Sequence, residues 1–257
     1  MYAEERHRTI VNLALRNDRV SVSDLATRFD VTTETIRRDL DALDKRGILR
    51  RVHGGAVVAE NLALVETALT EREPTFVVQK TKIAQAACEY LPRTGSTVLF
   101  DSGTSVARLA AVVPAGRLST VVTNSVPVAA QLALANGGPT QVHLLGGRVR
   151  GITQATVGSE TVGALARLRC DVAFLGTNGV SVRHGFSTPD PDEAAVKEAM
   201  VASARRVIVL ADSSKIGVEL LVTFAPTNAV DVLITDDGIS AHDRAELIST
   251  GMEVVIA

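Results

Sequence analysis

The spacing of apolar residues along the chain changes its period near residue 75. Before that point, apolar positions recur three and four residues apart, as they do on one face of a helix. Beyond it, short apolar runs alternate with amphipathic stretches, which is typical of strands that alternate with helices. The sequence therefore predicts a small, mainly helical domain followed by a larger α/β domain.

The larger region has the more regular pattern. Ile83, Ala87 and Leu91 share one face of a helix that ends near Pro92. This alternation predicts a mostly parallel sheet with helices on both faces. We expect strands at 97–100, 119–122, 141–145, 171–175, 206–210, 230–234 and 253–256, and helices at 105–113, 126–135, 160–168, 192–204 and 241–249.

The smaller region predicts two helices joined by a tight turn. Ser23 is expected to cap the first of them, and Thr32 the second, because each hydroxyl can accept a backbone N–H of the following turn. Ile36, Leu40 and Leu43 then give the second helix one apolar stripe. Helix, short turn and helix make a helix-turn-helix pattern.

The outer face of that second helix carries polar and basic side chains. Arg37 and Arg38 lie off the apolar stripe, and Thr33 and Thr35 lie in the first turn, the part of a recognition helix that meets base edges. A helical hairpin with a solvated basic face is the alternative, because surface helices often carry arginines. The residues that follow favour DNA binding.

A basic β-hairpin is predicted directly after the helices. Residues 48–53 alternate as a strand does, Gly54-Gly55 is a turn signal, and 56–58 can form the returning strand. Arg51 and His53 lie on this hairpin. A basic hairpin after a basic helix is the layout of a winged helix, and Gly47 is expected to end the helix before it.

Residues 6–57 resemble the winged helix-turn-helix of the DeoR family of bacterial transcription regulators. The motifs that carry the resemblance are TIRRDL at 35–40 and RVHGGA at 51–56. It implies that the helix reads bases and that the hairpin holds phosphates or a minor-groove edge. The DNA-binding residues expected from the pattern and the resemblance together are Thr32, Thr33, Thr35, Arg37, Arg38, Arg51 and His53.

Charge and composition narrow the class of protein. Residues 1–57 hold 11 Lys/Arg and 9 Asp/Glu, a net charge of +2, whereas residues 58–257 hold 16 and 20, a net charge of −4. Basic character is therefore local, and affinity for DNA must come from its placement and from oligomerisation. On the first helix, predicted over 2–16, Arg6 and Arg8 are each equally expected to be solvated or to touch phosphate.

The sequence gives no reason to expect a membrane segment, a disulfide or a metal site. No apolar run approaches the roughly 18 residues of a membrane helix, and the N-terminus lacks the apolar core of a signal peptide. Cys88 and Cys170 lie far apart and are expected to be free thiols. We expect a cytoplasmic protein without cofactor or metal.

Polar and glycine-rich residues follow almost every predicted strand. In an open parallel sheet, ligands bind beyond the carboxyl ends of the strands, so these residues predict a pocket. Residues 102–105 lead straight into a helix and form the expected anion seat, although no GxxxxGK[ST] motif is present. The expected effector-binding residues are Asp101, Ser102, Gly103, Thr104, Ser105, Asn124, Gly146, Gly147, Asn178, Gly179, Glu193, Lys197, Asp212 and Lys215.

Residues 75–257 look like the DeoR-type sensor domain, which is similar in fold to ribose-5-phosphate isomerase and binds phosphosugars. Segments that carry this resemblance include 82–84, 101–105, 173–176 and 211–215. The stretches 176–179 and 187–190 look most like actinobacterial members that repress fructose and other sugar-phosphotransferase operons. The resemblance implies a phosphorylated hexose as effector, with fructose 1-phosphate or 6-phosphate as first choices.

Two other functions remain open from the sequence. The first is a sugar-phosphate isomerase, but the GADE run of those enzymes is here GTNG at 176–179, and Glu198 is the one match to their base. The second is a DNA binder with a degenerate sensor domain. The favoured hypothesis is a repressor with a DNA-binding domain at 1–58, a linker at 59–74 and a sensor domain at 75–257. A homodimer or homotetramer would bind operator DNA.

Overall fold

The computed structural model describes residues 6–7, 9–11, 13–14, 19–45, 49–58, 68–92, 95–114, 116–135 and 140–257. They divide between two compact units, Met1–Val65 and Glu66–Ala257. Of the predicted linker, 59–67 lie outside the described residues, and 68–74 belong to the second unit. No helix among the described residues is long and apolar enough to span a membrane.

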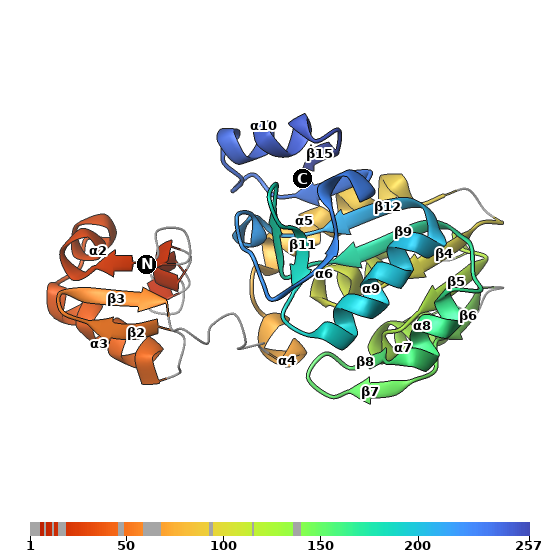
Figure 1. Ribbon diagram of the computed structural model, residues 1–257, viewed down its shortest axis with the longest axis horizontal. Helices are drawn as coiled ribbons and strands as arrows, with labels where there is room; N and C mark the ends of the chain where they lie inside the picture. Colours follow the sequence, from red (N-terminus) through yellow and green to blue (C-terminus); the bar gives the residue numbers. More distant parts are fainter. Residues whose placement is uncertain are drawn as a thin grey trace. The chain divides into compact units, whose positions relative to one another are not determined.

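The first unit is a winged helix-turn-helix (Figure 1). Its strands form an antiparallel sheet in the order β1-β3-β2, and the predicted stripe of Ile36, Leu40 and Leu43 is buried against Ile10 and Ala14 of the first helical segment. The elements after that segment are β1 (Arg19–Ser21), α2 (Val22–Phe29), α3 (Thr33–Lys45), β2 (Leu49–Val52) and β3 (Gly55–Val58).

Helix caps were predicted correctly in one case and wrongly in the other. Thr32 caps α3, because its Oγ1 accepts the Thr35 N–H at 3.2 Å. For α2 the cap is Ser21 rather than Ser23: the Ser21 hydroxyl accepts the Asp24 N–H at 3.5 Å. Ser21 ends a strand and has the extended backbone that a cap needs, whereas Ser23 is already helical.

The hairpin turn lies one residue earlier than predicted. It consists of His53 and Gly54, and Gly54 adopts a φ of +77°. Gly55 is the first residue of β3 and pairs with Ser21; a Cβ on it would lie 2.0 Å from the Val20 carbonyl oxygen. The two glycines therefore serve a turn and a close strand approach. Gly47 lies outside the described residues.

The second unit is built on a seven-stranded sheet in which every pairing is parallel. The order is β15-β14-β12-β9-β4-β5-β6. Every strand and helix predicted from residue 97 onward is present, with bounds shifted by at most three residues. The strands are β4 (Thr97–Phe100), β5 (Thr120–Thr123), β6 (Gln141–Leu144), β9 (Cys170–Gly176), β12 (Ala204–Leu210), β14 (Val232–Thr235) and β15 (Glu253–Ile256).

Helices cover both faces of this sheet, as predicted (Figure 1). Alternate strand residues point to opposite faces, so the sheet buries two separate apolar layers. The layer over α5, α6 and α7 includes Phe100 and Phe174, and the layer over α8, α9 and α10 includes Leu99 and Leu175. The helices are α5 (Val77–Ala87), α6 (Thr104–Val112), α7 (Val126–Ala135), α8 (Ser159–Leu165), α9 (Pro191–Ser203) and α10 (Ala241–Ser249).

Several short elements were not predicted. They include an antiparallel hairpin, a second sheet in the order β10-β11-β13, and a one-turn helix, α4, ahead of α5. Strands of three or four residues are too short to show a period. These elements are α4 (Leu69–Arg72), η2 (Cys88–Tyr90), β7 (Arg148–Arg150), β8 (Ala155–Val157), β10 (Gly179–Ser181), β11 (Gly185–Thr188), η3 (Ser213–Lys215), β13 (Val222–Ala225) and η4 (Thr227–Ala229).

The strand order defines where a ligand site belongs. From β4 the chain moves outward through β5 and β6, then returns to the other side of β4 with β9 and continues through β12, β14 and β15. The direction therefore reverses between β4 and β9. In open α/β sheets the crevice beyond the carboxyl ends of the strands at such a reversal is the usual ligand site.

Candidate functional site

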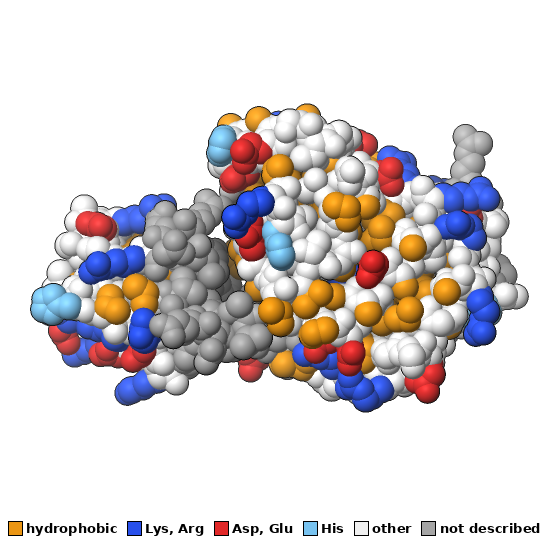
Figure 2. Space-filling model, viewed as in Figure 1, with side chains coloured by type: hydrophobic (Ala, Val, Ile, Leu, Met, Phe, Trp, Pro, Cys, Tyr) orange, Lys and Arg blue, Asp and Glu red, His pale blue; other side chains and the backbone are white. Residues whose placement is uncertain are grey.

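The outer face of α3 carries the charge that the sequence predicted. The Arg37 and Arg38 side chains are 54% and 80% exposed, and each guanidinium lies 3.6 Å from the Glu34 carboxylate. Exposed ion pairs at this distance contribute little to stability, so each guanidinium can readily leave Glu34 for another anion. Thr33 is exposed beside them in the first turn, and Figure 2 shows basic side chains over the outer surface of this unit.

The hairpin residues have different positions. His53 is exposed in the turn, and its carbonyl oxygen accepts a hydrogen bond from Arg19 Nη2 at 3.0 Å. Arg51 faces the helix instead: its Nη1 donates to the Arg37 carbonyl oxygen at 3.0 Å and to Asp41 at 2.7 Å. Arg51 thus fixes the hairpin to α3, which positions the Arg37 backbone.

A buried ion cluster behind α3 was not predicted. Asp39 lies on the inner face of α3 and accepts Arg6 Nε at 2.5 Å and Nη2 at 3.1 Å, and His7 Nε2 lies 2.8 Å from it. Arg6 was expected to be either solvated or in contact with phosphate. It is instead buried, so both expectations were wrong. The hydrogen bond that Arg6 donates to Asp39 raises the pKa of Arg6. The signal was present, because Asp39 falls three residues after Ile36 on the apolar stripe.

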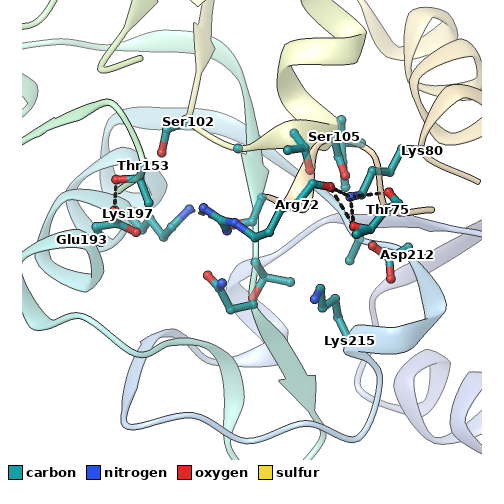
Figure 3. A pocket seen from close by; sticks show the side chains of 17 residues that line it. Arg72, Thr75, Lys80, Ser102, Ser105, Thr153, Glu193, Lys197, Asp212 and Lys215 are labelled. Carbon is teal, nitrogen blue, oxygen red and sulfur yellow. Dashed lines mark hydrogen bonds between the residues drawn. The ribbon is translucent and has the colours of Figure 1, made fainter. Parts of the chain in front are cut away.

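In the second unit, a pocket lies beyond the carboxyl ends of β4, β9 and β12, at the reversal of strand order (Figure 3). Predicted effector residues that line it are Ser102, Gly103, Thr104, Ser105, Asn178, Glu193, Lys197, Asp212 and Lys215.

The loop from β4 to α6 forms one wall. Gly103 is the N-cap of α6 with a φ of +123°, a conformation that favours glycine, and it has no side chain to cap the helix. The N–H groups of the first turn and the positive end of the helix dipole therefore face the pocket beside the hydroxyls of Ser102, Thr104 and Ser105. This wall is suited to an anion.

An ion pair braces the base of this wall. Asp101 lies beneath the pocket lining and accepts hydrogen bonds from Lys197 Nζ and, at 3.0 Å, from the Gly176 N–H. Lys197 Nζ also donates to the Gly176 carbonyl oxygen at 2.9 Å. Both side chains are at most 5% exposed. The pair joins the ends of β4 and β9, the two strands between which the pocket opens.

A second braced carboxylate lies at the start of α9. Glu193 accepts hydrogen bonds from the Thr153 hydroxyl and, at 3.1 Å, from Arg150 Nη1. Arg150 Nε also lies 3.1 Å from Asp190, the N-cap of α9. Thr153 comes from the β7–β8 hairpin, so an element that the sequence did not reveal supplies part of the pocket.

Three cations gather at another part of the pocket. Lys80 Nζ donates to the Arg72 and Thr75 carbonyl oxygens at 2.9 and 2.8 Å and to Thr75 Oγ1 at 3.3 Å. Burial lowers the pKa of Lys80 to about 8; Asp212 opposes this shift, while Lys215, Arg72 and Arg108 add to it. Arg72 Nε is buried without a hydrogen-bond partner among the described residues.

The turn that carries Lys215 is held from two sides. Asp212 accepts hydrogen bonds from the hydroxyl of Ser214 and, at 3.2 Å, from its N–H. Asp236 is buried and accepts the Ser213 N–H at 2.7 Å and the Ser213 hydroxyl at 2.8 Å. The Lys215 backbone N–H donates to the Asp212 carbonyl oxygen at 3.0 Å, but its ammonium group makes no hydrogen bond or ion pair with the residues that the structure describes.

Besides Asp101, which lies beneath the lining, four predicted effector residues do not line the pocket. Asn124 follows β5, and Gly146 and Gly147 follow β6, strands on the far side of β4 from the reversal. Their contacts are structural: the Asn124 amide donates to the Thr156 carbonyl oxygen, and the Gly146 carbonyl oxygen accepts the Thr161 hydroxyl. Gly179 belongs to β10, where a Cβ would lie 2.4 Å from the Val218 carbonyl oxygen.

The pocket also includes residues that were not predicted: Arg72, Thr75, Lys80, Thr153, Gly176, Thr177, Leu210 and Ala211. Arg72 lies in the stretch predicted as a linker, where no period marked an element. The described residues contain no group of three potential metal ligands. Glu198, the match to the isomerase base, is exposed on α9 and does not line the pocket.

An exposed arginine helix beside a β-wing, and an α/β unit with an anion-accepting pocket, are the parts of a ligand-responsive transcription regulator. Two family models match the chain: the DeoR-like helix-turn-helix domain over residues 6–61 and the DeoR C terminal sensor domain over residues 75–237. The chain belongs to the DeoR family. It is a transcription regulator rather than an enzyme, as the names of its relatives agree.

Full-length relatives support the assignment. The chain is 38% identical over 255 residues to the HTH-type transcriptional regulator GlpR of Haloferax volcanii, covering 99% of this chain and 98% of that protein. It is 32% identical over 255 residues to the lactose phosphotransferase system repressor of Streptococcus mutans, covering 99% and 100%. A solved structure of ribose 5 phosphate isomerase A from Neisseria gonorrhoeae matches with a TM-score of 0.38 and 14% identity, over 55% of this chain and 54% of that one.

Proposed function

We propose that the protein represses genes of sugar uptake or catabolism in the cytoplasm and that a phosphorylated sugar bound in the pocket controls it. The observation that carries the proposal is the meeting of the α6 N-terminus with Arg72, Lys80 and Lys215 at the reversal of strand order. A helix N-terminus with several cations is a site for a phosphate group. The name of the Streptococcus mutans relative refers to a sugar phosphotransferase system, which agrees with this effector class.

The rest of the pocket suits the sugar. Ser102, Thr153, Thr177 and Asn178 offer hydroxyl and amide groups, and Glu193 offers a carboxylate. Such groups fix the orientation of sugar hydroxyls and give specificity. We propose a hexose monophosphate, with fructose 1-phosphate or 6-phosphate as the first candidates.

For the DNA-binding unit we propose that Thr33, Thr35, Arg37 and Arg38 approach base edges and that His53 contacts a phosphate or a minor-groove edge. Thr32 contributes through its cap, and Arg51 by holding the hairpin against α3. A homodimer or homotetramer would place two such units on repeated half-sites. Effector control requires that the ligand bind the DNA-competent and DNA-incompetent states with different affinities.

The test is a fluorescence-anisotropy titration of the full-length protein against the DNA upstream of its own gene, with and without a panel of phosphosugars. We expect tight, salt-sensitive binding that one or more phosphosugars changes, and no conversion of the sugar by chromatography. Unchanged operator affinity in the Arg37→Ala/Arg38→Ala variant would reject the recognition helix.

The degenerate-sensor alternative makes the opposite prediction. It expects no phosphosugar to raise the melting temperature of the purified protein. The pocket opposes it, because uncommitted or buried cations such as Arg72, Lys80 and Lys215 are costly to keep together without an anion.

A further inference from the structure

We propose that the pocket selects ligands with a single phosphate group, and that the Glu193 carboxylate is the residue that rejects a second one. The proposal deepens the proposed function and rests on it, because it assumes that a phosphosugar occupies this pocket. It follows from the uneven distribution of charge between the two ends of the pocket, which Figure 3 separates.

One end is strongly cationic. Lys80, Lys215, Asp212 and Thr75 lie together on one side of the pocket (Figure 3). Lys215, Arg72 and Arg108 add to the lowering of the Lys80 pKa and Asp212 opposes it, so several cations lie near one carboxylate; of these, Lys80, Lys215 and Arg72 line the pocket. The Asp212 carboxylate is also engaged with Ser214. This end therefore holds an excess of positive charge, which a phosphate dianion would neutralise.

Lys80 contributes to this end through its charge. Its ammonium group has three protons, and the three oxygens of Arg72 and Thr75 described above accept them. Direct hydrogen bonds to a phosphate are left to Lys215, the Arg72 guanidinium and the first turn of α6. One phosphate thus has enough donors at this end.

At the opposite end, each cation of the described residues is paired with a carboxylate. Glu193, Thr153, Lys197 and Ser102 lie on the other side in Figure 3. The charge of Lys197 is matched by Asp101. The single guanidinium of Arg150 is shared between Asp190 and Glu193, each at 3.1 Å, so two carboxylates face one cation. This end has an excess of negative charge.

Burial makes that negative charge effective. The Glu193 side chain is 5% exposed, and the bonds from Thr153 and Arg150 hold it in place. Charges that are buried are screened far less by water and salt than exposed ones. A hydroxyl group at this end can donate to a carboxylate, whereas a phosphate would be repelled by it.

In Figure 3 the Arg72 side chain runs from the Lys80 end of the pocket toward the Lys197 end, so a ligand group at either end could use its charge. A monophosphate engages it together with Lys215. A bisphosphate would have to share it and would bring its second group against Glu193. The geometry therefore favours a sugar with phosphate at one terminus and hydroxyl groups at the other.

The experiment is isothermal titration calorimetry on the full-length protein with fructose 1-phosphate, fructose 6-phosphate and fructose 1,6-bisphosphate. For the unmodified protein we expect the better monophosphate to bind at least about tenfold more tightly than the bisphosphate, as a single buried like-charge contact provides. Glu193→Gln should narrow that ratio by about tenfold or more. Glutamine keeps an oxygen for the Thr153 hydroxyl, and Arg150 keeps Asp190.

Asp192→Asn is the matched control. Asp192 is the neighbouring residue in the same helical turn, its side chain is 53% exposed, and it pairs with Arg148 outside the pocket. The substitution removes one negative charge, as Glu193→Gln does, but not from the pocket. The monophosphate-to-bisphosphate ratio should stay at the value of the unmodified protein.

Three results would overturn the proposal while leaving the proposed function intact. They are equal or tighter binding of the bisphosphate by the unmodified protein, an unchanged ratio in Glu193→Gln, or the same change in Asp192→Asn as in Glu193→Gln. If Glu193→Gln fails to fold, the monophosphate-to-bisphosphate affinity ratio of the unmodified protein still tests whether the pocket prefers a single phosphate group. Absence of binding by all three sugars would overturn the proposed function together with this inference.

Discussion

The two units of this protein hold their functional charges in opposite ways. In the first, Arg37 and Arg38 are mostly exposed and are only loosely paired with Glu34. In the second, Lys197 and Glu193 are almost fully buried, and each is fixed by short polar contacts. Exposed charges exchange their partners freely, which suits binding to a polyanion through contacts with many phosphates. Buried charges keep their strength and direction, which suits the choice between similar small ligands.

The Asp39 cluster is the exception within the first unit, and its removal should have the largest effect. Asp39→Ala leaves Arg6 buried without its carboxylate, and loss of one partner of a buried pair costs about 3–5 kcal/mol of the free energy of unfolding. Hydrogen exchange of amides in α3 would measure it. Asp41→Ala, which removes an exposed partner of Arg51, should cost less than about 1 kcal/mol. If Asp39→Ala and Asp41→Ala lowered the free energy of unfolding equally, the proposed difference between buried and exposed charges would be wrong.

The exposed arginines should matter for DNA alone. Arg37→Ala is expected to weaken operator binding by about 1–3 kcal/mol and to leave phosphosugar affinity unchanged, because the side chain is solvated in the free protein. Anisotropy and calorimetry on the same preparation would show this. Arg183→Ala is a suitable control, since Arg183 is an exposed arginine of the second unit that pairs with Glu219; it should leave operator affinity at its original value.

In the second unit, the role of Asp236 in positioning the turn that carries Lys215 should be detectable. Asp236→Asn is expected to weaken phosphosugar binding by up to about tenfold by loosening the Ser213–Lys215 turn. If Asp236 acts through Lys215, the double variant Asp236→Asn/Lys215→Ala should lose no more phosphosugar affinity than Lys215→Ala alone. Asp231→Asn removes a similar bond, to the Val207 N–H, at the amino ends of β12 and β14, away from the pocket, and should leave the ligand affinity unchanged. Additive losses in the double variant would reject the coupling.

Lys80 gives the pocket a pH dependence. Its pKa of about 8 lies below the value of 10.5 for an unfolded chain, so between these pH values the unfolded state binds more protons. The stability penalty of burying this charge is therefore present below pH 8 and is relieved as the pH rises from about 8 to 10.5. Ligand binding should change in the opposite direction, because deprotonation removes a cation from the phosphate end.

We expect phosphosugar affinity to fall by up to about tenfold between pH 7 and pH 9, over which the phosphate itself stays dianionic. Calorimetry across this range would measure the change. Lys80→Arg keeps the charge over the whole range and should flatten the profile. A profile that is equally steep in Lys80→Arg would assign the dependence to another group.

The smallest expected effect lies at the α3 cap. Thr32→Ala removes the acceptor of the Thr35 N–H and should lower the free energy of unfolding of the first unit by about 1 kcal/mol. Chemical denaturation followed by a probe in that unit would detect it. Thr33→Ala is the control: Thr33 is exposed on the helix, and its side chain makes no hydrogen bond to the described part of the chain, so the substitution should change stability less.

Much of the site could be predicted because it depends on local rules. The α6 N-terminus, Lys197, Asp212 and Lys215 were found since each follows a strand or lies on a helix whose period is visible. Arg72 and Thr153 were missed because they come from a one-turn helix and a hairpin whose strands are three residues long. Asn124 and Gly146 were wrongly placed in the pocket because the ends of strands look alike in sequence wherever the strands lie.

The sequence by itself determined the two-unit organisation, the parallel α/β class and the exposed basic face of α3, since these follow from period, caps and turn residues within a few positions along the chain. Only the tertiary structure decided strand order, and with it which loops meet at the reversal between β4 and β9. It also decided that Arg6 faces Asp39 and that Arg150 is shared between Asp190 and Glu193. The reason is physical: partners such as Arg6 and Asp39, far apart in sequence, are chosen by packing and by the cost of burying charge, which no local pattern records.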